Sequence, residues 1–188
     1  LDARHGPRGQ GRRRRGRLTS TVATVEPALH PDVAALACLL GRWSGEGEGS
    51  YPTIEPFSYR EEISFGHAGK PFLAYRQATV RLDTGLPAHA EMGYLRGTGP
   101  GRVELVIAHP TGVAEVAEGT VDATPDGLTL RLRSTSVTGT PTAKDVRSIE
   151  RSLTVEGDTL HYDLSMAAVG QPHQHHLRAE LHRLDEAG

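Results

Sequence analysis

The chain has 188 residues, a formal net charge of −2 and a hydrophobic fraction of 37%, values that suit one globular domain. The near-neutral charge gives no electrostatic reason to bind nucleic acid or an anionic membrane, so neither is expected as a partner. The single cysteine, Cys38, excludes an intramolecular disulfide, and no apolar run reaches the ~20 residues of a membrane-spanning helix. We therefore expect a cytoplasmic protein.

The first predicted segment, residues 1–24, combines arginine, glycine and proline with few large apolar side chains. Such a segment cannot offset its ordering entropy by burying apolar surface, so we predict a disordered tail. The run from Arg12 to Arg15 is also compatible with an arm that binds nucleic acid. The rest of the chain lacks a matching basic face, which favours the disordered tail.

A short helix is predicted next, ending at Gly41. Asp32 is a candidate N-cap because its carboxylate can accept a hydrogen bond from an unpaired backbone N–H of the first turn. The helix has an apolar stripe formed by Val33, Leu36, Leu39 and Leu40. Such a stripe is suited to covering one end of the region that follows.

From Gly41 onward, apolar and polar residues alternate with the period of a β-strand. We predict ten strands, at 41–50, 56–65, 71–82, 89–96, 102–108, 113–121, 127–137, 145–155, 159–168 and 174–183. Short turns rich in glycine and proline separate several of them, and turns this short join antiparallel neighbours.

Ten short antiparallel strands can form either a sandwich or a closed barrel. An up-and-down order with few long connections favours the barrel, because closure removes exposed strand edges. We therefore predict an all-β fold over residues 25–188, a ten-stranded antiparallel up-and-down β-barrel with a short N-terminal helix. A barrel of this width can enclose a ligand.

The first predicted strand belongs to the run GRWSGEGEGSYPTIEPFSYREE, from Gly41 to Glu62, with glycine at every second position. One face of that strand is therefore bare of side chains. This permits a bent strand at a barrel corner, with Trp43 in the core, or the close approach of a ligand or another strand. The run is not a phosphate-binding loop, because no GxxxxGK[ST] order is present.

This run resembles the signature of the nitrobindin family, GxWxGxG followed by YPTI and an aromatic-rich second strand. The resemblance continues through GKPFLAY at 69–75, HAEMGY at 89–94 and MAAVGQPHQHHL at 166–177. It covers about residues 30–184, which is nearly the whole predicted barrel domain.

The resemblance implies a barrel related in shape to the fatty-acid-binding proteins and lipocalins. It also implies a ferric haem b, exposed at one mouth of the barrel and held by a histidine of the last strand. The activity it implies is that of a peroxynitrite isomerase, an enzyme that converts peroxynitrite to nitrate and also binds nitric oxide. No CxxCH motif is present, so the haem is expected to be noncovalent.

Histidines cluster near the C-terminus, at positions 173, 175, 176 and 182. Strict alternation points His175 inward, with Leu177 and the apolar residues after it. The family pattern places the axial iron ligand directly before the leucine, which selects His176 as the catalytic residue and haem-iron ligand. A β-bulge after Pro172 would reconcile the two readings.

Six further residues are candidates for the haem pocket. The resemblance carries over Thr53, His89, His109 and Met166, although family members vary at position 109. Ile149 shares the predicted buried face of Leu153. Lys144 could pair with a haem propionate, or it could be an ordinary solvated surface lysine.

Two other functions remain open from the sequence. The same haem would serve a non-enzymatic carrier or sensor of nitric oxide, because both roles need one histidine and one open iron site. A lipocalin-like binder of apolar ligands would need no iron. The chain is expected to be a monomer or a homodimer.

Overall fold

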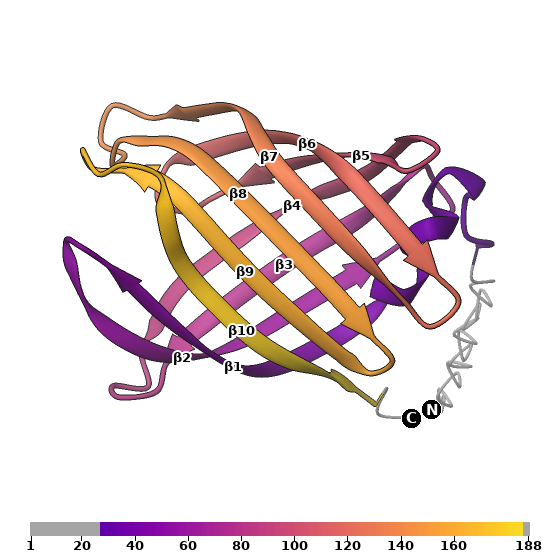
Figure 1. Cartoon of the computed structure of the whole chain (residues 1–188), viewed down its shortest axis with the longest axis horizontal. Helices are drawn as coiled ribbons and strands as arrows, with labels where there is room; N and C mark the ends of the chain where they lie inside the picture. The colour runs from indigo at the N-terminus through magenta and orange to yellow at the C-terminus, as the bar shows by residue number, and fades with distance from the viewer. Residues whose placement is uncertain (1–26, 186–188) are drawn as a thin grey trace, which may run out of the picture.

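The computed structural model describes residues 27–185, so the tail predicted over 1–24 lies outside it. The described chain forms a closed barrel of ten antiparallel strands, each paired with its neighbours in chain order, and β1 paired with β10 (Figure 1). The elements are η1 (Pro31–Leu39), β1 (Gly41–Tyr51), β2 (Ile54–Gly66), β3 (Phe72–Arg81), β4 (Pro87–Gly99), β5 (Arg102–Ala108), β6 (Val113–Thr124), β7 (Gly127–Gly139), β8 (Val146–Glu156), β9 (Thr159–Ala168) and β10 (Gln174–Leu184). The prediction of a ten-stranded antiparallel barrel with a short N-terminal helix is confirmed. Between residues 27 and 185, no helix is long and apolar enough to cross a membrane.

The period-two pattern places apolar side chains inside the barrel and polar ones outside. On β7, Leu128, Leu130 and Leu132 are buried, whereas Arg131 and Arg133, which alternate with them, are exposed. Burying each leucine contributes about 1.5–3 kcal/mol, so the alternation fixes which face of each strand turns inward.

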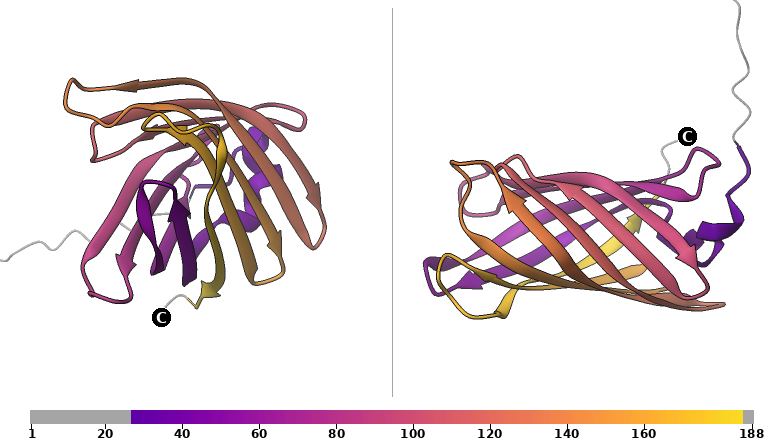
Figure 2. Two further views of the ribbon diagram at one scale, coloured as in Figure 1. Left: turned by 60° about the vertical axis from the view of Figure 1, so that its left-hand side comes forward. Right: turned by 90° about the horizontal axis from the view of Figure 1, so that it is seen from above.

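The helix η1 covers one end of the barrel, opposite the hairpin tip between β1 and β2 (Figures 1 and 2). It is a 3-10 helix in which Val33, Leu36 and Leu39 are buried, and their spacing of three matches its three residues per turn. The predicted cap was wrong: His30 is the N-cap, and its Nδ1 accepts a hydrogen bond from the backbone N–H of Asp32 at 3.2 Å. Asp32 lies inside the helix because Pro31 already occupies its first position.

The bare glycine face of β1 is approached closely by its neighbours. A Cβ at Gly45 would collide with the backbone of β10, and a Cβ at Gly47 or Gly49 would collide with the ring of Tyr59 or Phe57 on β2. The glycines therefore make room for two aromatic rings and a close strand partner. Both rings line the cavity described next.

Candidate functional site

A cavity of about 490 Å³ lies inside the barrel at the end opposite η1, bordered by loop residues such as Thr111 and Thr142. Its volume is within the ~300–1,000 Å³ typical of small-molecule and cofactor sites. Six predicted site residues line it: His89, His109, Lys144, Ile149, Met166 and His176. Thr53 is exposed in the turn between β1 and β2, and it is not among the lining residues.

A β-bulge in β10 decides how the two neighbouring histidines point. Pairing with β9 shifts register between His175 and Leu177, which leaves His176 as the extra residue. His175 is exposed, and its Nε2 lies 3.2 Å from a carboxylate oxygen of Asp163. His176 is partly buried and lines the cavity. Strict alternation wrongly predicted that His175 points inward, because it assumes that every residue of one strand pairs with one residue of its neighbour.

The imidazole of His176 is held in one tautomer. Its Nδ1 lies 3.0 Å from the backbone oxygen of Ser50, an acceptor only, so Nδ1 carries the proton and Nε2 keeps its lone pair. Burial lowers the pKa of His176, which favours the neutral ring. Histidines that bind metals are usually oriented by this kind of outer hydrogen bond.

Two aromatic rings from the glycine-rich motif fix the orientation of His176. The ring of Tyr51 meets it edge-on at 5.2 Å between centroids, and that of Phe57 lies at 6.5 Å. The hydroxyl oxygen of Tyr51 also accepts a hydrogen bond of 2.9 Å from the backbone N–H of Ala168. Tyr51 thus links the end of β1 to the turn that leads into β10.

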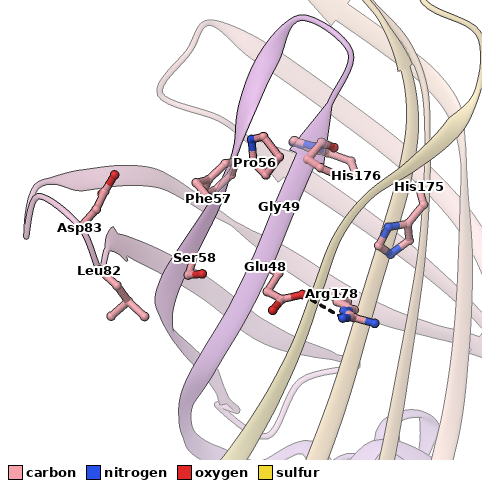
Figure 3. Close-up of a pocket in the computed structure, with 11 residues that line it drawn as sticks. Glu48, Gly49, Pro56, Phe57, Ser58, Leu82, Asp83, His175, His176 and Arg178 are labelled. Atoms are coloured by element: carbon pink, nitrogen blue, oxygen red, sulfur yellow. Dashed lines mark hydrogen bonds and ion pairs between the residues drawn. The ribbon is translucent and has the colours of Figure 1, made fainter.

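His176 also borders an open groove on the outside of the barrel, between the β1–β2 hairpin and β10 (Figure 3). The groove carries an exposed ion pair in which Arg178 Nη2 lies 2.8 Å from Glu48 Oε2. Since His176 lines both the groove and the cavity, its ring stands at the mouth. A planar ligand bound by it would have one edge near solvent.

A buried charge cluster lies along the cavity wall, and it was not predicted from the sequence. The guanidinium of Arg151 contacts both carboxylate oxygens of Glu115 at 2.6 and 2.7 Å, and Glu91 Oε2 at 3.0 Å. The hydroxyl of Tyr75 donates to the other oxygen of Glu91 at 2.7 Å. Burial alone would raise the pKa of Glu91, but the charge of Arg151 and the hydrogen bond from His89 outweigh it and hold that pKa well below its ordinary value.

A third buried acid, Glu61, has no cation at hydrogen-bond distance among the residues that the structure describes. Its Oε1 accepts a hydrogen bond of 2.6 Å from Gln77 Nε2, and its Oε2 has no partner among the described residues. Burial raises the pKa of Glu61 to about 7. The folded state therefore keeps a proton that the unfolded state releases above its ordinary pKa of 4.5.

Glu61→Gln is expected to stabilise the protein more as the pH rises. Because the folded wild type binds the extra proton, its free energy of unfolding falls between about pH 4.5 and pH 7. Glu61→Gln cannot bind this proton, so its free energy of unfolding does not fall in the same way. The difference in free energy of unfolding between the variant and the wild type therefore grows across that window towards about 3 kcal/mol, at ~1.4 kcal/mol per pKa unit. Urea unfolding at pH 4.5 and pH 8 measures the difference.

The matched control is Glu62→Gln, because the side chain of Glu62 is 59% exposed on the opposite face of the same strand. It should change the free energy of unfolding by less than about 0.5 kcal/mol at either pH. An advantage of Glu61→Gln that is the same at both pH values would contradict the raised pKa.

Comparison with known proteins agrees with this architecture. The model of the THAP4-like, heme-binding beta-barrel domain family matches residues 32–183. A peroxynitrite isomerase of Nocardia farcinica is 54% identical over 166 residues, covering 87% of this chain and 99% of the relative. Peroxynitrite isomerase 2 of Mycobacterium avium is also 54% identical, over 155 residues, covering 82% of this chain and 96% of the relative.

A solved structure has the same fold. The crystal structure of Rv2717c from M. tuberculosis superposes with a TM-score of 0.81 at 50% identity, covering 84% of this chain and 99% of that one. The family model covers most of the chain, and the relatives are matched almost from end to end. This chain belongs to the THAP4-like family of heme-binding β-barrel domains, the nitrobindin family.

Proposed function

We propose that this chain binds ferric haem b noncovalently through His176 and isomerises peroxynitrite to nitrate. The observation that carries the proposal is the neutral imidazole of His176 at the cavity mouth, with Nδ1 donating to Ser50 and Nε2 left for a metal. The relatives named peroxynitrite isomerase, 54% identical over most of the chain, support the reaction.

The residues of the cavity fit a haem. Apolar side chains, among them Ile149, Leu164 and Met166, line its walls and would contact a porphyrin. Lys144 borders the mouth and is exposed, where its ammonium would meet a propionate carboxylate. Thr53 would contact the haem only from the exposed turn outside the cavity.

Each part of the site has a separate role in this reaction. When bound, haem supplies an open iron coordination position, at which peroxynitrite can rearrange to nitrate without any other reactant. His176 would bind the iron, and the rings of Tyr51 and Phe57 keep its imidazole in place. Met166 and Ile149 exclude water from the buried side of the cavity.

Nitric oxide would bind at the same open iron position, so we include it as a second ligand. A cytoplasmic location and a monomeric or homodimeric state remain predictions from the sequence. The same holds for a barrel domain that begins at residue 25, after a tail.

Titration with hemin, followed by stopped-flow mixing with peroxynitrite, tests the function. We expect a Soret band at one hemin per chain and nitrate formation that accelerates in proportion to the haem-loaded protein. A haem protein that binds nitric oxide but does not accelerate nitrate formation would be a carrier or sensor instead. Colourless protein that takes up no hemin would overturn the proposal in favour of a haem-free binder of apolar ligands.

A further inference from the structure

Three potential metal ligands converge on one wall of the cavity. His89 and Glu91 are two residues apart on β4, so their side chains lie on the same face of the strand. His109 directly follows β5, whose Ala108 pairs with Met92. The register thus places His109 beside Glu91. The side chains of Glu91 and His109 are 2% and 6% exposed, and that of His89 is 34% exposed.

The distances among the three ligand atoms match a tetrahedral metal site. His109 Nδ1 lies 3.3 Å from His89 Nε2 and 3.2 Å from Glu91 Oε2, and His89 Nε2 lies 3.5 Å from Glu91 Oε2. Ligands bound to zinc at about 2.0–2.1 Å in a tetrahedron are separated by roughly 3.3–3.4 Å. One ion could therefore reach all three atoms with little movement.

Hydrogen bonds alone cannot make all three contacts favourable. If both imidazoles carry a proton on these nitrogens, both can donate to Glu91, but then two N–H groups face each other. If only one carries a proton there, the other nitrogen turns its lone pair towards the carboxylate. A cation in the centre of the triangle is attracted by all three atoms at once.

The residues around the three ligand atoms supply a negative charge that would compensate a metal ion, and an outer partner that would orient His109. Glu91, Glu115 and Arg151 are buried together and carry a net charge of −1, so a further positive charge would be compensated there. If His109 Nδ1 binds a metal, its proton must lie on Nε2, which is buried 3.6 Å from Glu115 Oε2. A carboxylate behind the far nitrogen is the usual outer partner of a zinc-bound histidine. Arg151 and a metal can share Glu91 Oε2, because a carboxylate oxygen has two lone pairs.

We propose that His89, Glu91 and His109 form a second metal site, which binds a divalent ion of the zinc type and keeps its fourth position open to the cavity. Two imidazoles, one carboxylate and one open position are a typical ligand set for zinc that acts as a Lewis acid. The site is separate from His176, which lies on β10 at the mouth of the same cavity.

Equilibrium dialysis of the haem-loaded protein against buffered free Zn²⁺, with metal content measured by mass spectrometry, tests this site. We expect about one zinc ion per chain. His109→Ala and His89→Ala should each weaken binding by more than the ~10–100-fold that loss of an outer partner costs. Circular dichroism checks that each variant is folded. If His109→Ala, at the more buried position, does not fold, the result for His89→Ala tests the site.

The matched control is the surface group of His161, Glu180 and His182, in which both histidines also approach a glutamate, at 3.8 and 3.6 Å. The double variant His161→Ala, His182→Ala should keep its zinc, and so should His176→Ala, whether or not it holds haem. The proposal is overturned if the wild-type protein binds no zinc. It is also overturned if the double variant His161→Ala, His182→Ala loses zinc while His89→Ala retains it.

Discussion

His176→Ala is expected to remove stable haem binding and, with it, acceleration of nitrate formation. The variant loses the neutral nitrogen that Ser50 and Tyr51 orient at the cavity mouth. Loss of an outer partner alone weakens metal binding ~10–100-fold, so loss of the ligand itself should weaken hemin binding by at least about 100-fold. Hemin titration followed at the Soret band measures the change.

His175→Ala is the matched control, because it removes an imidazole from the adjacent position without touching the cavity. His175 is exposed and faces Asp163 on the outer surface. Its variant should bind hemin with wild-type affinity and spectrum. If His175→Ala lost the Soret band and His176→Ala retained it, the ligand assignment would be reversed, and the bulge in β10 would have been misread.

Imidazole added to His176→Ala distinguishes a missing ligand from a collapsed cavity. The truncated side chain leaves space beside Tyr51 and Phe57, whose rings contact that of His176. Free imidazole at millimolar concentration should partly restore the Soret band if the cavity is intact. A variant that stays unable to bind haem with imidazole present, while folded by circular dichroism, would show that His176 shapes the cavity rather than binding the iron.

The strand order could be predicted from the sequence because its alternation is regular. On β7 and β9, leucine and tyrosine recur at every second position between polar residues, and the short turns leave little choice of neighbour. The helix was placed correctly but capped wrongly. The predicted cap, Asp32, and the observed cap, His30, both precede the apolar stripe, and Pro31 between them decides where the helix begins.

The charge cluster was missed although the sequence contained a signal for it. Glu115 lies between Val113 and Ala117, and Arg151 lies between Ile149 and Leu153, so alternation alone turns both charges inward. Their pairing depends on contacts between β6 and β8, two strands that are not neighbours in the barrel. Alternation says which face a residue occupies, but not which residue it meets across the interior.

Arg151→Met should be among the most destabilising single substitutions in the barrel. The side chain of Arg151 is 2% exposed and compensates Glu91 and Glu115, which would both remain buried without a cationic partner. Breaking a buried pair in this way costs about 3–5 kcal/mol, a large part of the ~5–15 kcal/mol that holds a domain folded. Urea unfolding at pH 8 measures the loss.

The pH dependence of the stability lost in Arg151→Met identifies the cause of that loss. In the wild type, Arg151 holds the pKa of Glu91 low, so its stabilising contribution is complete above the ordinary carboxylate pKa and declines as the pH falls. In Arg151→Met, burial without the cation raises the pKa of Glu91, and acid relieves the penalty by protonating it. The difference in free energy of unfolding between Arg151→Met and the wild type should therefore be smaller at pH 5 than at pH 8.

Two further variants separate charge from packing at this position. Arg133→Met removes an arginine that is 78% exposed and 3.4 Å from Glu150, and it should cost at most about 1 kcal/mol. Adding Glu91→Gln and Glu115→Gln to Arg151→Met removes the uncompensated charges and should recover part of the lost stability, because a neutral buried cluster is less costly than an unpaired one. A triple variant no more stable than Arg151→Met at pH 8 would show that the guanidinium acts mainly as a packing element in the cavity wall.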